Sequence, residues 1–153
     1  MSNILILYAT YSGGTEMAVH AVETELVKEH HTVILKTPSQ IKLEEILSFE
    51  SIIFASPSWD YEGKGGQPHE EFFSFFQKAE NLNLDEKKIA VFGLGDTSYP
   101  EFCGAVNVLE KFVTDRKGAL SIPSHRINGF LFNQEEETKK LVEWARTFLM
   151  HLS

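Results

Sequence analysis

Hydroxyl side chains and glycines are concentrated between Ala9 and Glu16, in the sequence A-T-Y-S-G-G-T-E. The paired glycines let the backbone curl so that several N–H groups converge, and the three hydroxyls add side-chain donors. A helical pattern follows directly, so its N-terminus adds positive partial charge. The segment therefore predicts a phosphate-binding loop, although a plain strand-to-helix turn with an N-cap remains the alternative. It lacks the Lys and the glycine spacing of a nucleotide-triphosphate loop.

No Lys or Arg precedes Lys28 in the chain. A phosphate bound in this loop would therefore be held by neutral dipoles, and its negative charge would stay uncompensated. That arrangement is unexpected for an enzyme that captures an anionic substrate. It suits a cofactor whose reduced, anionic form should be disfavoured.

Two further loops carry aromatic residues. Trp59-Asp60-Tyr61 follows an apolar run, and G-L-G-D-T-S-Y-P-E-F-C-G-A-V from Gly93 to Val106 contains Tyr99. Trp59 could pack on the rim of the core, or it could stack on a flat ligand and gain roughly 1 kcal/mol beyond area burial. Two aromatic loops beside a phosphate cradle together indicate a site for a phosphorylated planar heterocycle.

Alternating strand and helix patterns must position these loops. Apolar runs predict strands at 3–8, 32–35, 51–56 and 88–93, with a weaker strand between Ala119 and Phe130. Between them lie helical stripes, the sharpest running from Leu141 to Leu149 at i, i+3, i+4, i+7 and i+8. This order predicts one α/β domain spanning residues 1–153, with five strands and five helices in a doubly wound parallel sheet. Ligands bind beyond the carboxyl ends of such strands, where the three loops lie.

Composition limits the alternatives. The single cysteine, Cys103, excludes an internal disulfide and a four-cysteine iron–sulfur cluster. The net charge of −8 disfavours a nucleic-acid partner. We find no secretory pattern and no apolar stretch approaching the ~20 residues of a membrane span, so we expect a cytoplasmic location. The histidines show no metal-site spacing, and we expect them on the surface: His20, His30, His31, His69, His125 and His151.

These residues resemble the flavodoxin family from end to end. T-Y-S-G-G-T is similar to the family's T/S-x-T/S-G-x-T phosphate loop, and G-D-T-S-Y-P-E-F-C-G-A-V is similar to its flavin loop. The resemblance implies a three-layer α/β/α sandwich, a five-stranded parallel sheet of order 2-1-3-4-5, and FMN as the cofactor. The short passage from Leu120 to Phe130 indicates the short-chain subclass.

The resemblance also implies roles for individual residues. Trp59 would stack on the inner flavin face and Tyr99 on the outer face, while the backbones of Asp96, Glu101 and Cys103 would bond the pyrimidine edge. The side chain of Cys103 is interpreted as a small buried hydrophobe. The implied cofactor-binding residues are Thr10, Tyr11, Ser12, Gly13, Gly14, Thr15, Ser58, Trp59, Asp60, Tyr61, Gly95, Asp96, Tyr99, Glu101, Phe102 and Cys103.

Asp60 departs from the Gly or Asn that many flavodoxins carry after the stacking aromatic. In those proteins the peptide flips so that its carbonyl accepts a hydrogen bond from the N–H formed when flavin N5 gains a proton. Asp adopts unusual backbone angles less readily than Gly, so the resemblance alone does not define how this position behaves.

The implied function is a low-potential, one-electron carrier between redox enzymes, with no substrate of its own and no catalytic residue. Expected partners carry basic patches and are of the flavodoxin/ferredoxin reductase or oxidoreductase type, with no nucleic acid and no membrane among them. We expect a monomer. The alternative is an FMN-dependent NAD(P)H:quinone reductase on the same fold, which would need room for a second ligand on the flavin.

Overall fold

The computed structural model describes residues 3–10, 13–61, 64–97 and 102–152, and nothing is described of the side chains of Asp60 and Tyr61. Five strands form the main sheet: β1 (Asn3–Tyr8), β2 (Thr32–Lys36), β3 (Ser51–Pro57), β6 (Lys88–Gly95) and β7 (His125–Asn128). A separate hairpin consists of β4 (Trp59–Tyr61) and β5 (Lys64–Gln67). The helices are α1 (Gly14–Lys28), α2 (Leu43–Leu47), α3 (Glu71–Lys78), α4 (Gly104–Asp115) and α5 (Gln134–Leu149).

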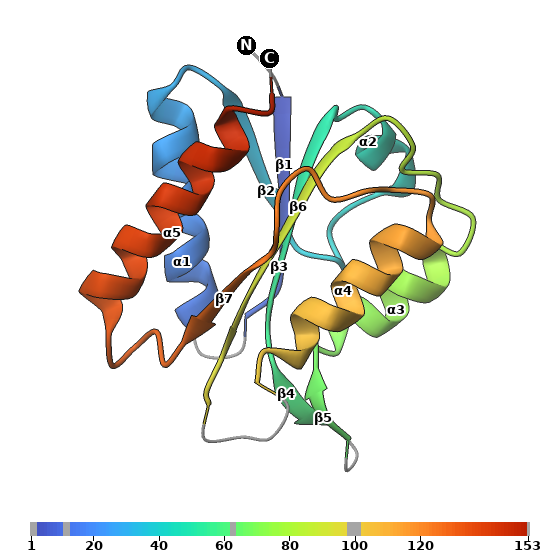
Figure 1. Ribbon diagram of the computed structural model, residues 1–153. Helices are drawn as coiled ribbons and strands as arrows, with labels where there is room; N and C mark the ends of the chain where they lie inside the picture. Colours follow the sequence, from blue (N-terminus) through green and yellow to red (C-terminus); the bar gives the residue numbers. More distant parts are fainter. Residues whose placement is uncertain (1–2, 11–12, 62–63, 98–101, 153) are drawn as a thin grey trace.

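All neighbouring strands of the main sheet run parallel, in the order β2-β1-β3-β6-β7. Counted along this sheet alone, the order is 2-1-3-4-5, so the predicted topology is confirmed. Because the strands are parallel, their carboxyl ends all meet at one end of the sheet, at the bottom of Figure 1. The order reverses between β1 and β3, which is where a doubly wound sheet offers a ligand-binding crevice.

Side-chain alternation along the buried strands builds two cores. Leu5 and Leu7 of β1 lie in the core beneath α3 and α4, whereas Ile4 and Ile6 lie in the core beneath α1 and α5. Figure 1 shows these helix pairs on opposite faces of the sheet. Runs that are apolar on both faces are therefore correctly predicted as central strands.

The two helices of one face are joined by an ion pair. Arg146 Nε of α5 donates a hydrogen bond of 2.8 Å to Glu25 Oε1 of α1. This bond, together with the positive charges of Arg146 and Lys28, lowers the pKa of Glu25 against the opposing effect of burial. The pair adds a polar contact to the apolar core that α1 and α5 share.

Some boundaries differ from the predictions. The sequence spacing predicts Phe72, Phe73 and Phe76 on one face of a helix, but the buried face of α3 consists of Phe72 and Phe75, with Phe76 packed against it. The spacing also predicts Phe102 on the apolar stripe of the next helix, but α4 begins only at Gly104. The β4–β5 hairpin was not predicted, because K-G-G-Q carries no apolar alternation.

In the part of the chain that the structure describes, no helix combines the length and hydrophobicity needed to cross a bilayer.

Candidate functional site

A hollow of about 190 Å³ opens at the carboxyl end of the sheet. Four chain segments supply its walls: the loop after β1, the end of β3 with the start of β4, the end of β6, and the turn after β7. The lining residues are Thr10, Gly14, Thr15, Pro57, Ser58, Trp59, Leu94, Gly95, Gly129, Phe130, Leu131 and Phe132. Six of the predicted cofactor-binding residues are among them, namely Thr10, Gly14, Thr15, Ser58, Trp59 and Gly95.

The loop after β1 has the geometry of an anion cradle. Gly13 adopts a left-handed conformation with φ of 86°, and its N–H donates to Thr10 Oγ1 at 3.0 Å. Among the described residues, none apart from its chain neighbours would lie within 4 Å of a Cβ atom on Gly13, so they leave space beside this peptide. α1 begins at the next residue, and the first N–H groups of a helix have no intrahelical acceptor. Tyr11 and Ser12 lie outside the described residues.

The electrostatic environment of this loop is negative. Tyr8, at the end of β1, has a pKa above its ordinary value, first because of burial and then because of the charges of Glu16 and Glu23. Glu16 lies in the first turn of α1. Neutral hydroxyl and backbone N–H groups are therefore the donors that this loop offers to an anion.

The loop after β3 presents Trp59 to the hollow. Trp59 is 54% exposed and lines the hollow, so part of its surface is accessible to a flat ligand. Ser58 fixes its backbone: the Ser58 N–H donates to Leu94 O at 2.9 Å, and the Ser58 hydroxyl accepts the Ala105 N–H at 3.0 Å. Asp60 and Tyr61 continue as β4, but their side chains lie outside the described part.

In the described part of the loop after β6, Gly95 lines the hollow. Tyr99 and Glu101 belong to the segment 98–101, which lies outside the described residues. Cys103 is fully buried, and its thiol donates weakly to Gly93 O at 3.7 Å and Ile127 O at 3.6 Å. The complete burial of Cys103 confirms the interpretation of its side chain as a small buried hydrophobe, and burial raises the pKa of the thiol to about 11.

Phe102 contributes differently from the other members of this loop. Its ring is partly buried and packs against the core cluster that lies beneath α3 and α4. It does not line the hollow in the part of the chain that is described.

The backbone of the β4–β5 hairpin closely approaches the N-terminus of α4. A Cβ atom on Gly104, the first residue of α4, would lie 2.6 Å from both Cα and the carbonyl O of Gly66 in β5. Only a glycine fits at this distance. The β4–β5 hairpin, which begins with Trp59, is thereby placed directly on the N-terminus of α4.

The turn after β7 was missed by the sequence predictions. Gly129, Phe130, Leu131 and Phe132 line the hollow, and Leu131 and Phe132 are 54% and 89% exposed. Consecutive large apolar side chains between a strand and the charged start of a helix could have indicated them, because contiguous exposed apolar groups mark binding sites more often than single ones do.

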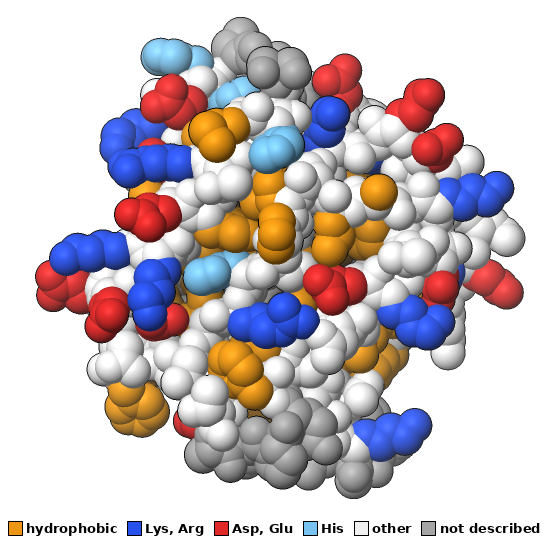
Figure 2. Space-filling model, in the orientation of Figure 1, with side chains coloured by type: hydrophobic (Ala, Val, Ile, Leu, Met, Phe, Trp, Pro, Cys, Tyr) orange, Lys and Arg blue, Asp and Glu red, His pale blue; other side chains and the backbone are white. Residues whose placement is uncertain are grey.

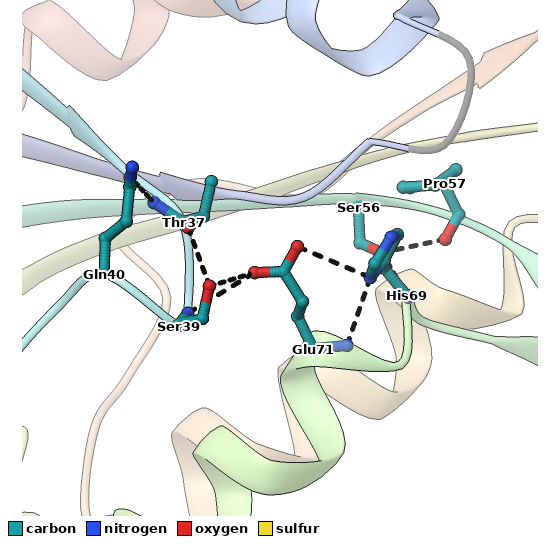
Figure 3. A network of polar contacts seen from close by, with 7 residues as sticks. All are labelled: Thr37, Ser39, Gln40, Ser56, Pro57, His69 and Glu71. Carbon is teal, nitrogen blue, oxygen red and sulfur yellow. Dashed lines mark hydrogen bonds and ion pairs between the residues drawn. The ribbon is translucent and has the colours of Figure 1, made fainter.

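A polar network links the hollow to the loop after β2 (Figure 3). The backbone N–H of His69 donates to Ser56 Oγ at 2.9 Å, and this hydroxyl donates to Pro57 O at 2.8 Å. The ring Nδ1 of His69 accepts the Glu71 N–H at 3.1 Å, and so caps the start of α3. The Glu71 carboxylate in turn accepts a 2.7 Å hydrogen bond from the Ser39 hydroxyl.

His69 is only 7% exposed, so the expectation that it lies on the surface is wrong. An imidazole can be buried at a helix start because its ring nitrogen replaces a missing backbone acceptor there. Within the described residues, no three His, Cys, Asp or Glu side chains gather as a metal site would require.

The fold and the hollow define a class: a doubly wound α/β protein with an anion cradle at a helix N-terminus and an exposed aromatic at its topological switch point. A family model described as Flavodoxin matches residues 6–144. The chain therefore belongs to the flavodoxin family.

Individual relatives agree with this assignment. Probable flavodoxin 2 of Bacillus subtilis (strain 168) is 33% identical over 149 residues, which cover 97% of this chain and 95% of the relative. The crystal structure of oxidised Flavodoxin 2 from Bacillus cereus has a TM-score of 0.87 and 33% identity, covering 97% of this chain and 99% of that chain. The crystal structure of Fusobacterium nucleatum flavodoxin bound to flavin mononucleotide has a TM-score of 0.81 over 100% of both chains, and at 21% identity this likeness concerns the fold alone.

Proposed function

We propose that this chain binds one FMN in the hollow at the carboxyl end of the sheet and carries electrons between larger redox enzymes. The observation that carries the proposal is the joint placement of a neutral anion cradle and the half-exposed Trp59 ring on one hollow at the switch point. Flavodoxins are electron carriers rather than enzymes, and the NAD(P)H:quinone reductase alternative is not favoured.

The residues present fit a phosphorylated flavin. The left-handed Gly13 leaves open space, its neighbours offer neutral donors, and helix α1 begins at the cradle. We assign the phosphate to the segment 10–15, including Tyr11 and Ser12. We assign the flavin ring to Trp59 and Tyr99 and to the backbones of the other predicted residues, Ser58, Asp60, Tyr61, Gly95, Asp96, Glu101, Phe102 and Cys103.

Bound FMN supplies the redox chemistry, taking up and releasing electrons through its isoalloxazine ring. The chain's own residues would tune that chemistry through charge. The loops around the hollow contain one Lys and several acidic residues, namely Lys64 against Glu16, Asp60, Glu62, Asp96 and Glu101. Negative charges that surround a ring disfavour its electron-rich form, so these loops favour a low reduction potential.

We further propose that the chain works as one monomeric domain, residues 1–153, in the cytoplasm. The net charge of −8 would steer partners with basic patches, of the flavodoxin/ferredoxin reductase or oxidoreductase type. On the face in Figure 2 acidic and basic side chains are interspersed, which argues for steering by the loops around the hollow rather than by that face. Transfer to such a partner should slow as salt is added, whereas rates that do not depend on salt would contradict this docking.

Titration of FMN with the flavin-free protein tests the binding proposal. Stacking on an aromatic ring quenches flavin emission, so we expect saturable quenching at one FMN per chain. Trp59→Leu should raise the dissociation constant about tenfold, because it removes roughly 1 kcal/mol of stacking and some buried area. The matched control is Trp144→Phe, which changes the buried tryptophan of α5 and should leave the dissociation constant unchanged. Equal affinities for the Trp59→Leu variant and the native chain would refute the assignment of Trp59.

A further inference from the structure

The turn after β7 presents two apolar side chains on a rigid support. Gly129 has φ of 54°, and its carbonyl O accepts the N–H groups of Phe132 at 3.0 Å and Asn133 at 3.1 Å. Phe130 is 4% exposed and anchors the turn in the core beneath α1 and α5. The turn therefore holds Leu131 and Phe132 outward by its own hydrogen bonds.

The same turn is bonded to the loop after β6. The Gly129 N–H donates to Gly95 O at 2.9 Å, and the side chain of Asn128 accepts the Thr97 N–H at 3.0 Å. These hydrogen bonds tie the position of the turn after β7 to that of Gly95, which also lines the hollow.

Leu131 reaches the anion cradle. A Cβ atom on Gly14 would lie 3.9 Å from Leu131 Cγ, so the leucine side chain lies beside the first residue of α1. Phe132 extends the same apolar wall and is 89% exposed.

An apolar wall matters here because the cradle is neutral. The chain has no Lys or Arg before Lys28, and none of the described residues that line the hollow is Lys or Arg, so neutral donors would hold a phosphate in the segment 10–15. Such bonds become electrostatically stronger when water is excluded and the local dielectric is low. A leucine and a phenylalanine beside the cradle would exclude that water.

We propose that Leu131 and Phe132 are cofactor-site residues that shield the phosphate cradle from water and so raise the affinity for the phosphorylated flavin. This inference rests on the proposed FMN site. It predicts that the wall acts on the phosphate rather than on the ring, because Leu131 lies against Gly14 of the cradle. FMN and riboflavin, which differ only in the phosphate, separate the two effects.

The experiment measures dissociation constants of FMN and riboflavin for Leu131→Ser and Phe132→Ser by quenching of flavin emission. We expect the FMN constant to rise about tenfold in each variant, or ~1.4 kcal/mol. The riboflavin constant should change by less than about twofold. Met150→Ser is the matched control, because Met150 is also largely exposed but follows α5 and does not line the hollow. Urea unfolding of the flavin-free variants should match the native chain, since both side chains are exposed.

The outcomes separate this inference from the function on which it rests. A native chain that binds no FMN would refute the proposed function. Native binding with unchanged FMN constants in both variants would overturn the inference alone. Equal weakening of FMN and riboflavin would also overturn it, because the wall would then act on the ring instead of the phosphate.

Discussion

The close approach between α4 and β5 makes a sharp prediction for Gly104→Ala. The new Cβ would lie 2.6 Å from two backbone atoms of Gly66, the Cα and the carbonyl O, and 3.0 Å from its carbonyl carbon. Backbone atoms cannot rotate away as a flexible side chain can, so α4 and the hairpin must separate. Overpacking of this kind costs about 1–3 kcal/mol.

A smaller gain opposes this cost. Replacing glycine by alanine reduces the entropy of the unfolded chain and favours the folded state by about 0.4–1 kcal/mol where the backbone tolerates it. The net expectation is a loss of about 1.5 kcal/mol, which corresponds to a fall of roughly 3–6 °C in melting temperature for a chain of this size. FMN affinity should fall too, because the displaced hairpin begins with Trp59.

Gly14→Ala is the matched control, since Gly14 is likewise the first residue of a helix. Its Cβ would lie 3.6 Å from Leu94 Cδ2, an ordinary contact, so the variant should stay within about 0.5 kcal/mol of the native chain or exceed it slightly. Urea unfolding of the flavin-free proteins, followed by circular dichroism, measures both. If Gly104→Ala is as stable as Gly14→Ala, the contact with Gly66 does not constrain the site and the reasoning is refuted.

Three further predictions concern buried polar groups. Burial raises the pKa of the Cys103 thiol to about 11. At pH 8 a thiol reagent should therefore label the folded protein at least roughly 200-fold more slowly than the unfolded chain. Equal labelling rates would contradict the burial of Cys103. The hydrogen bond from Arg146 lowers the pKa of Glu25 in the folded protein below its usual value of 4.5. The ionised Glu25 side chain therefore stabilises the fold fully above pH 4.5, and this stabilisation is lost as the pH falls through the lowered pKa. Thermal melts from pH 6 to 3 should therefore show a steeper decline for the native chain than for Glu25→Gln, and parallel declines would refute this. His69→Ala should cost about 1 kcal/mol in urea unfolding through the lost cap of α3, while His69→Asn, which retains an acceptor, should recover most of it; no recovery would indicate that the ring packs rather than caps.

The central strands could be predicted because burial on both faces leaves a continuous apolar run, as in Ile4 to Leu7 and Ile52 to Ala55. The edge strand β7 was located only within a wide range, because it is four residues long and Ile127 is its one fully buried residue. The five-residue α2 is too short to show a period, and the prediction did not place it.

Parts of the site were predictable and others were not. Glycines and hydroxyls before a helix indicated the cradle because the chemistry depends on residue type and local order. Leu131 and Phe132 join the hollow through the hydrogen bond from Gly129 to Gly95, a contact between segments far apart in sequence. The role of Gly104 depends on its distance to Gly66, and no local pattern carries that distance.

Whether the chain is a one-electron carrier can be measured by stepwise anaerobic reduction of the FMN-loaded protein, followed by its visible spectrum. We expect a yellow protein with one flavin per chain that takes up its electrons in two separate one-electron steps. Bleaching in a single two-electron step would contradict the one-electron carrier, and a chain that stays colourless with excess FMN would contradict the cofactor site itself.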